Sequence, residues 1–195
     1  MKEYKLNNNN NFIDGYYLSD LSICDDLIDF FNKSDSKVKG KIGGGLNIKV
    51  KDSLDLQLSI NLIPEHKILQ SYFEELSKII ELYKTKYKFC DEIVDRWGVE
   101  YDFNIQKYQP TQGYHQWHCE KASINTSKRH LVYMTYLNDV KKGGETEWYY
   151  QKLKVKPEKG LTFIWGSDWT FTHKGHTTID EDKYIITGWY ELRNN

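Results

Sequence analysis

The chain has 195 residues, with 27 Lys and Arg against 28 Asp and Glu, 15% aromatic residues and only 3 prolines. This length favours one domain, residues 1–195, and the composition excludes a disordered or collagen-like chain. The balanced charge gives no indication of a nucleic-acid partner, and no signal-type leader or apolar run of bilayer-spanning length occurs, so no membrane association is expected.

The three cysteines are odd in number, widely spaced and outside any CxxC pattern: Cys24, Cys90 and Cys119. They therefore indicate neither a disulfide framework nor a structural zinc knuckle, and they favour a cytoplasmic location. The asparagine run at residues 7–11 is of low complexity and is predicted to be a solvated loop.

The first half of the sequence predicts helices. Apolar residues recur at helical steps from Ser19, a candidate N-cap, to Phe31. Residues 37–46 contain four glycines and are predicted to form a loop, followed by a short strand or turn at 49–54. The strongest helical pattern begins near Pro64 and continues to about Lys86. Residues of about 15–90 are thus expected to be a helical support.

After Asp91 the pattern changes to short β-branched and aromatic segments separated by Gly, Asn and Asp. The predicted strands are 99–108, 115–119, 129–138, 146–155, 161–165, 169–174 and 183–192, with turns at 141–144 and 157–160. No helix long enough for a parallel crossover lies between them. We therefore expect a mainly β fold, an antiparallel sandwich or barrel over about residues 95–192, with the helices on one sheet face.

The segment HQWHCE, residues 115–120, suggests half of a metal site. On a strand, His118 and Glu120 lie two residues apart on the same face and can converge on one ion. Alone the pair is a weak signal, since a polar strand end is the commoner explanation. Two histidines and one carboxylate would leave three octahedral positions open, as non-haem Fe(II) oxygenases require. The candidates for the third ligand are His115, His130, His173 and His176, of which His173, on a late aromatic strand, is favoured.

Lys183 follows His173 by ten residues on the last predicted strand. A lone cation inside an aromatic-lined barrel is costly unless an anion meets it, and a dicarboxylate cosubstrate would supply that anion. A solvated lysine at a strand start is the alternative.

Taken together, the second half resembles the prolyl 4-hydroxylase-like branch of the iron(II)- and 2-oxoglutarate-dependent dioxygenases. The resemblance covers about residues 98–191, and its elements occur in the family's order. They are Tyr108, Gly113-Tyr114, His118-Cys119-Glu120, Arg129 leading to Tyr136-Leu137-Asn138, Gly143-Gly144-Glu145-Thr146, Val155-Lys156-Pro157-Glu158-Lys159-Gly160, His173 and Lys183.

The resemblance implies a double-stranded β-helix, a cupin-like jelly roll, with His118, Glu120 and His173 as Fe(II) ligands. It implies that Lys183 binds the distal carboxylate of 2-oxoglutarate and that Tyr108 or Tyr114 hydrogen-bonds the same cosubstrate. No catalytic residue beyond the metal ligands is expected.

The implied reaction is hydroxylation of an unactivated C–H bond, with peptidyl proline as the candidate substrate. Oxygen is consumed and 2-oxoglutarate is decarboxylated to succinate and CO2. Arg129 is a candidate for facing the substrate, which is a peptide or a small molecule, and ascorbate is an expected accessory reductant. The substrate-determining loops are placed at 37–62 and 121–128.

Two features depart from the family pattern. Glu120 stands where the family usually has Asp, and the tyrosines lie one residue farther from His118 than is common. A strand irregularity between Tyr114 and His118 would explain both, because bulges redirect side chains beside active sites. If Glu120 did not bind iron, halide or water could take its place, or the protein could be inactive.

Other expectations concern the cavity walls and the competing functions. Four tryptophans are candidate walls, although such residues are more often simply core: Trp117, Trp148, Trp165 and Trp189. The alternatives to an oxygenase are a non-catalytic cupin-like binding module and a zinc hydrolase using the same ligands. Lys183 discriminates between them, because a hydrolase has no use for a buried cation there.

Overall fold

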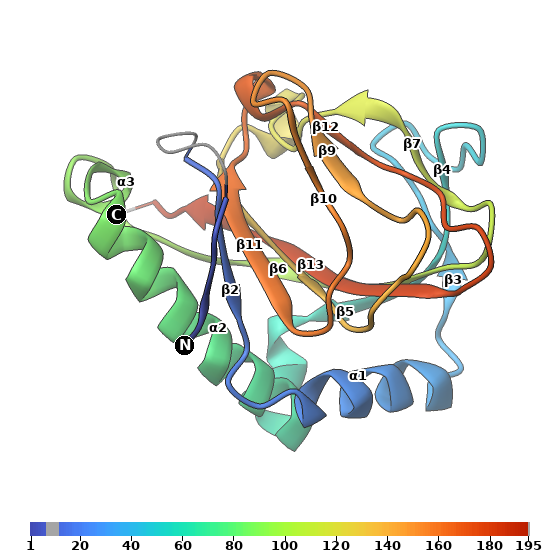
Figure 1. The fold of residues 1–195 in the computed structure, drawn as a ribbon. Coiled ribbons are helices and arrows are strands. Elements are labelled where there is room, and N and C mark those ends of the chain that lie inside the picture. Colours follow the sequence, from blue (N-terminus) through green and yellow to red (C-terminus); the bar gives the residue numbers. More distant parts are fainter. Residues whose placement is uncertain (7–11, 195) are drawn as a thin grey trace.

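The computed structural model describes residues 1–6 and 12–194, so the predicted asparagine loop at 7–11 lies outside the described residues. In this part of the chain the strands form two sheets (Figure 1). The larger sheet has the order β1-β2-β11-β8-β13-β6-β5-β3 and the smaller has the order β10-β9-β12-β7-β4. All the recorded strand pairs are antiparallel, which confirms the predicted mainly β jelly roll.

The strands of the larger sheet are β1 (Glu3–Tyr4), β2 (Asp14–Tyr17), β3 (Val38–Lys39), β5 (Leu54–Ser59), β6 (Trp97–Tyr108), β8 (Arg129–Tyr136), β11 (Leu161–Gly166) and β13 (Lys183–Leu192). Those of the smaller sheet are β4 (Lys51–Asp52), β7 (Gly113–His118), β9 (Thr146–Trp148), β10 (Leu153–Val155) and β12 (His173–Gly175). The helices are α1 (Ser22–Lys33), α2 (Lys67–Lys86) and α3 (Phe89–Glu92), with 3-10 turns η1 (Ile60–Glu65), η2 (Ile124–Thr126) and η3 (Trp169–Phe171).

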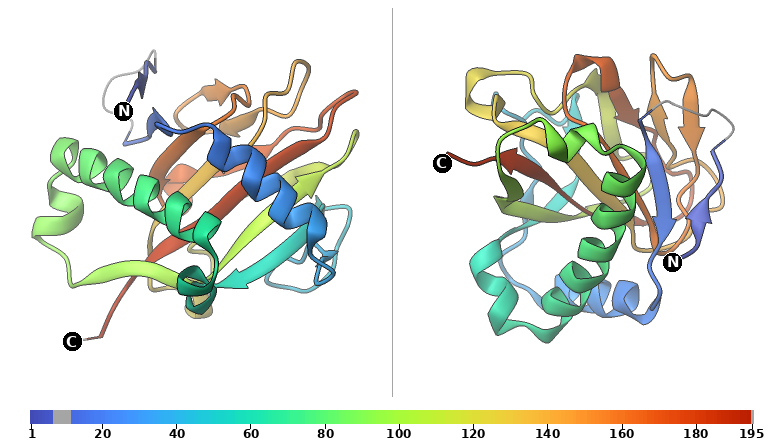
Figure 2. Two further views of the ribbon diagram at one scale, coloured as in Figure 1. Left: turned by 90° about the horizontal axis from the view of Figure 1, so that it is seen from below. Right: turned by 90° about the vertical axis from the view of Figure 1, so that its left-hand side faces the viewer.

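Alternation along the strands of the larger sheet builds two separate cores. In β8, Leu131 and Tyr133 face a core shared with α1 and α2, whereas Val132 and Met134 face a core between the two sheets. The helices therefore cover the outer face of the larger sheet, as Figure 2 shows from below and from the side. The smaller sheet covers part of its inner face and leaves room for a site between the sheets.

The helix starts differ from the prediction. Helix α1 begins at Ser22, and Asp20, not Ser19, accepts hydrogen bonds from the Ser22 amide and hydroxyl. The Ser19 amide instead bonds Glu75 on α2. Pro64 lies in η1, before α2 begins at Lys67. Helix α1 starts later than predicted because Asp20 binds the backbone of its first turn. Helix α2 starts later because the proline-containing turn η1 occupies its predicted first residues.

Several strand predictions were incomplete. Residues 54–59 form β5, whereas the sequence predicted only a short strand or turn at 49–54. Residues 146–155 form two strands, because a turn containing Lys152 at positive φ separates β9 from β10. Residues 169–171 are a 3-10 turn capped by Asp168, so the strand that carries His173 is only three residues long.

Strands β2 to β5 show that the first ninety residues also contribute to the sheets and are not only helical support. The organisation of residues 1–195 as a single domain stays a prediction. Among the helices of the described chain, none combines the length and apolar character needed to traverse a lipid bilayer.

Candidate metal centre

The predicted ligands meet where the ends of two neighbouring strands face each other. His118 ends β7, His173 begins β12, and the two residues are register partners. Each imidazole Nε2 lies 3.5 Å from Oε1 of Glu120, and the three ligand atoms lie within 4.8 Å of one another. Two imidazole nitrogens and one carboxylate oxygen thus converge on one point, which is the ligand set of a facial triad.

Backbone carbonyls orient both imidazoles. Nδ1 of His118 lies 3.0 Å from the carbonyl of Gln116, and Nδ1 of His173 lies 2.9 Å from the carbonyl of Phe171. A carbonyl can only accept, so Nδ1 carries the proton and Nε2 keeps its lone pair. Both Nε2 atoms are therefore available to a metal.

The protonation states also suit metal binding. Burial by itself raises the pKa of Glu120, but the adjacent imidazoles of His118 and His173 outweigh burial and hold that pKa well below its usual range. Burial, and then the neighbouring His173, lower the pKa of His118. At neutral pH, Glu120 is therefore an ionised carboxylate and His118 is a neutral imidazole.

A second set of contacts fixes the other oxygen of Glu120. The indole Nε1 of Trp189 donates to Oε2 at 2.9 Å, and Nη1 of Arg129 lies 3.5 Å from the same atom. The Arg129 guanidinium is stacked 3.5 Å from the Trp189 ring centroid and bonds Glu100 through two nitrogens at 2.8 and 3.1 Å. Oε2 is thus occupied and Oε1 is left facing the imidazoles, so the longer glutamate has a defined orientation.

The strand irregularity predicted beside the site is present. His118 pairs with His173 and Tyr114 pairs with Gly175. These partners are four residues apart on β7 but only two apart on β12, so β7 bulges between them. The distortion brings the Tyr114 ring parallel to the His118 imidazole, with centroids 3.6 Å apart and an 8° interplanar angle. The imidazole is therefore held on one face by an aromatic ring.

Lys183 lies deeper in the same space. Its side chain is buried, and its Nζ donates to the carbonyl of Gly144 at 3.1 Å. Within residues 1–6 and 12–194 it forms no ion pair. Burial lowers the pKa of Lys183 to about 8, and the negative charge of Glu145 offsets this only in part. A buried ammonium without a carboxylate partner is a strong candidate for binding an anion.

The turn opposite Lys183 depends on two glycines. Gly143 and Gly144 have φ values of +77° and +74°, which L side chains rarely adopt. A Cβ on Gly143 would lie 2.2 Å from the carbonyl oxygen of Thr177. This close approach places the Gly144 carbonyl against the ammonium of Lys183.

The ring of Tyr108 lies beside the ammonium, with its centroid 4.8 Å from Nζ of Lys183. Its hydroxyl donates to Oε1 of Gln106 at 2.7 Å. Burial, and then the charge of Asp55, raise the pKa of Tyr108 well above its usual value, so the hydroxyl stays protonated and able to donate.

One cavity of about 790 Å³ joins these groups. It is lined by every residue singled out for the site: Tyr108, Tyr114, His118, Glu120, Arg129, His173 and Lys183. Trp117, Trp165 and Trp189 also line it, but Trp148 does not: that side chain is fully buried in the core between the sheets, so its predicted role as a wall was wrong.

The other histidines have different partners. His130 Nε2 lies 2.7 Å from the carbonyl of Cys90, and His176 Nε2 lies 2.6 Å from Glu147. His115 is exposed. Among the candidates for a third ligand, only His173 joins His118 and Glu120.

Sequence reasoning missed one wall of the cavity. Alternate residues of β5 and β6 present carboxylates and amides to it: Asp55, Gln57, Asp102, Asn104 and Gln106. The sequence did carry a signal for this wall: polar residues alternate with leucines in LDLQLS of β5, and the even-numbered positions 102, 104 and 106 of β6 are polar. This wall makes one side of the cavity polar.

Comparisons with known proteins agree with this arrangement. A sequence profile described as the 2OG-Fe(II) oxygenase superfamily matches residues 103–191. A search of curated proteins finds no match.

Solved structures share the fold at low sequence identity. The collagen prolyl hydroxylase of Paramecium bursaria Chlorella virus 1, in its 2-oxoglutarate complex, has a TM-score of 0.68 at 21% identity, covering 94% of this chain and 98% of its own. A Pseudomonas putida prolyl-4-hydroxylase has a TM-score of 0.70 at 13% identity, covering 95% of each chain. A Trichoplax adhaerens prolyl hydroxylase bound to a hypoxia-inducible-factor peptide has a TM-score of 0.72 at 14% identity, covering 93% of this chain and 84% of its own.

Proposed function

We propose that the chain is a 2OG-Fe(II) oxygenase, as the profile match over residues 103–191 supports, and that it hydroxylates an unactivated C–H bond, with a peptidyl proline as the candidate substrate. It is a 2-oxoglutarate-dependent dioxygenase that uses Fe(II), 2-oxoglutarate and O2. The observation that carries the proposal is the buried, unpaired ammonium of Lys183 in the same cavity as His118, Glu120 and His173.

We assign the metal to His118, Glu120 and His173. Two imidazoles and one carboxylate fit Fe(II), and they leave open positions for a chelating cosubstrate. Once bound, Fe(II) and 2-oxoglutarate supply the oxidising chemistry, in which the cosubstrate loses CO2 and becomes succinate. The protein holds the ligands: carbonyls fix the imidazoles, and Trp189 with Arg129 fixes the carboxylate.

We assign the distal carboxylate of 2-oxoglutarate to Lys183. A buried, desolvated ammonium is stabilised more by a bound anion than an exposed ammonium is, because the local dielectric constant is low. Tyr108 lies next to Lys183 and Tyr114 lies next to His118, so either hydroxyl is close enough to serve the same cosubstrate from within the cavity. The Tyr108 hydroxyl donates to Gln106 in this structure, so it would have to exchange that partner for the cosubstrate. Apolar side chains of the inter-sheet core exclude water behind it.

The substrate then occupies the outer part of the cavity, between the polar wall of β5 and β6 and the loop after Glu120. The prolyl hydroxylases named above share the fold, and one of them was solved with a peptide, which supports a peptide substrate here. Arg129 lines the same region and is proposed to border the substrate while it holds Glu120. A zinc hydrolase has no use for Lys183, which weighs against that alternative.

The test is turnover. Purified enzyme with Fe(II), 2-oxoglutarate and ascorbate is incubated with a panel of proline-containing peptides, while succinate and peptide mass are followed. We expect succinate formation that is stimulated by a peptide and matched by addition of one oxygen atom to a proline. Stimulation by a non-peptide compound alone would overturn the peptidyl-proline assignment, and succinate formed equally by a Lys183→Ala variant would overturn the cosubstrate assignment.

We also propose a reducing, cytoplasmic location. All three cysteines carry free thiols, as expected where disulfides do not form.

A further inference from the structure

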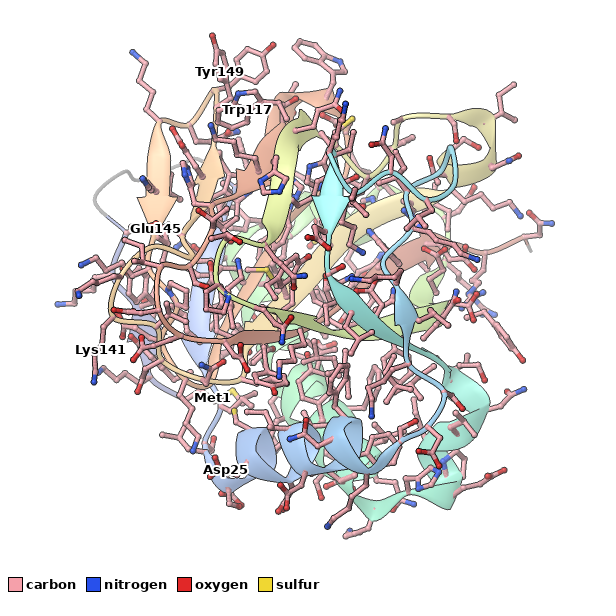
Figure 3. The ribbon with its side chains drawn as sticks, turned by 90° about the vertical axis from the view of Figure 1, so that its right-hand side faces the viewer. Met1, Asp25, Trp117, Lys141, Glu145 and Tyr149 are labelled. Carbon is pink, nitrogen blue, oxygen red and sulfur yellow. The ribbon has the colours of Figure 1, made fainter. Side chains whose placement is uncertain are left out.

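The larger sheet has an open edge beside the active-site cavity. Strand β5 is paired with β6 along its whole length, but its outer neighbour β3 pairs only with Leu54 and Asp55. Within the described residues, no strand therefore lies on the outer side of β5 from Leu56 to Ser59. In Figure 3, β3 is the short light-blue arrow beside the teal β5, which continues past it. We call this stretch, residues 56–59, the β5 edge.

The direction of the backbone groups shows which of them are free on the β5 edge. The carbonyl of Ser53 accepts from the amide of Gly40, so at residue 53 the backbone points to the outer side. In an antiparallel ladder this direction alternates from residue to residue. Gln57 thus turns its N–H and C=O to the outer side, and Ser59 turns its N–H the same way. No hydrogen bond within the described chain occupies these three groups.

The β5 edge has none of the features that normally prevent a sheet edge from pairing. Such edges are usually blocked by charged side chains, proline or a bulge. Gln57 and Ser59 are uncharged, the β5 edge contains no proline, and it pairs with β6 without a register shift. Leu56 and Leu58 are buried in the core under the helices, which holds the strand in place, while Gln57 is exposed. The β5 edge is therefore a fixed template for an added strand.

The β5 edge also borders the active-site cavity. Gln57 lines the cavity, as does its ladder partner Asn104 on β6. Four positions from Asn104 in one direction, β6 carries the carboxylate that bonds Arg129, and four positions in the other direction it carries the ring beside Lys183. Neighbouring strands lie about 4.8 Å apart, so a chain paired with the β5 edge can extend into the cavity.

The chemistry of the β5 edge suits an extended peptide. Free N–H and C=O groups that recur every second residue, about 6.6 Å apart, match the backbone of an extended chain, and peptides add to sheet edges in this way. Three hydrogen bonds give too small a contact for a stable pairing of two copies of this chain. They are sufficient for a peptide whose reacting residue is held in the cavity at the same time. The contact therefore favours the substrate as the occupant.

We propose that the peptide substrate binds the β5 edge as an added strand, with the backbone of a segment flanking the reacting residue paired to Gln57 and Ser59. This inference rests on the proposed function for the peptide nature of the substrate. It adds a docking surface outside the metal and cosubstrate sites. It also means that recognition of the flank depends on its backbone more than on its side chains.

The first experiment leaves the protein unchanged. The probe is a fluorescein-labelled nonapeptide in which alternating valine and threonine flank a central proline. It is titrated anaerobically with enzyme that contains Fe(II) and 2-oxoglutarate, fluorescence anisotropy is followed, and peptides that carry one N-methyl group each are then compared. Along one flank, methylation of every second amide is expected to weaken binding roughly three- to tenfold, the effect of one lost hydrogen bond. Methylation of the amides between them is expected to have little effect.

The second experiment changes one backbone group of the β5 edge. Gln57→Pro removes the free N–H, and proline is tolerated on an edge strand where the N–H faces outward. Gln57→Ala is the matched control, because it loses the same side chain and keeps the N–H. The dissociation constant of the peptide is expected to be roughly three- to tenfold higher for Gln57→Pro than for Gln57→Ala. Thermal unfolding and Co(II) binding verify that both variants are folded, and the N-methyl series decides the question if Gln57→Pro does not fold.

The outcomes separate this inference from the proposed function. Peptide binding that is indifferent to N-methylation and equal in the two Gln57 variants overturns the β5 edge and leaves the proposed function standing. The period-two pattern without hydroxylation of any peptide supports the β5 edge and overturns the peptidyl-proline function. Failure of the peptide to bind at all, or a wild-type dimer that Gln57→Pro dissociates, overturns the β5 edge as a substrate site.

Discussion

Replacing Trp189 by phenylalanine tests how a glutamate serves in place of the family's usual aspartate. The substitution removes the Nε1 donor to Oε2 of Glu120 and leaves an aromatic ring for Arg129 to stack on. A hydrogen bond to an ionised group contributes about 1.5–3 kcal/mol. The Glu120 side chain is only 15% exposed, so water replaces the lost donor poorly. With tenfold in affinity per 1.4 kcal/mol, metal binding is expected to weaken roughly 10- to 100-fold.

The assay is an anaerobic competition titration in which Co(II) is shared between the enzyme and a fluorescent chelator, with thermal unfolding followed in parallel. Trp97→Phe is the matched control, because the buried Nε1 of Trp97 has no hydrogen-bond partner among the described residues and lies outside the site. We expect the control to bind Co(II) as the wild type does. If Trp189→Phe also retains wild-type Co(II) affinity, Trp189 does not orient Glu120 and the reasoning fails.

Three further predictions follow from the same contacts. Glu120→Asp restores the family's usual residue, yet we expect it to weaken Co(II) binding. The shorter side chain cannot accept the hydrogen bond from Trp189 and also reach both imidazoles. Tighter Co(II) binding by this variant would contradict the prediction. The value of kcat/KM for 2-oxoglutarate should be level below pH 8 and fall above it, since the pKa of Lys183 is about 8 and only the ammonium binds a carboxylate. If a Lys183→Arg variant shows the same fall, the deprotonation of Lys183 is not its cause. Lys183→Met should strongly weaken cosubstrate binding yet raise the free energy of unfolding at pH 7 by up to roughly 3 kcal/mol, because lowering the pKa from 10.5 to about 8 costs about 1.4 kcal/mol per unit. The wild type should then gain stability as pH rises from 8 to 10.5, where the unfolded chain binds the extra proton, and thermal melts of both proteins measure the difference.

The features of the fold that the sequence predicted well are those with a strong local pattern. Strand β6 alternates between apolar and polar residues from Val99 to Gln106, and β8 and β13 are runs rich in β-branched and aromatic residues, so the approximate bounds of all three followed from the sequence. His118 and Glu120 do come together, but not as two residues of one strand: β7 ends at His118, and Glu120 lies in the bend that follows it. Their role as metal ligands stays a prediction. The strand irregularity was predicted from the extra residue between the tyrosines and His118.

The features that were missed depend on partners far away in sequence. Trp189 is 69 residues from Glu120, and no local pattern connects them. Strand β5 was hidden beside a glycine- and lysine-rich stretch and forms because β6 pairs with it along its whole length. The rings of Trp117, Tyr149, Tyr150 and Trp169 come from three separate segments that the fold brings together.

The central claim is that His118, Glu120 and His173 bind iron while Lys183 binds the cosubstrate. Anaerobic addition of Fe(II) and then 2-oxoglutarate, followed by visible absorption, tests it most directly. The wild type is expected to develop the charge-transfer band of the iron-bound keto acid, His173→Ala to show none, and Lys183→Ala to bind iron but to need far more 2-oxoglutarate. A wild type without the band, or a His173→Ala variant with the full band, would contradict the account.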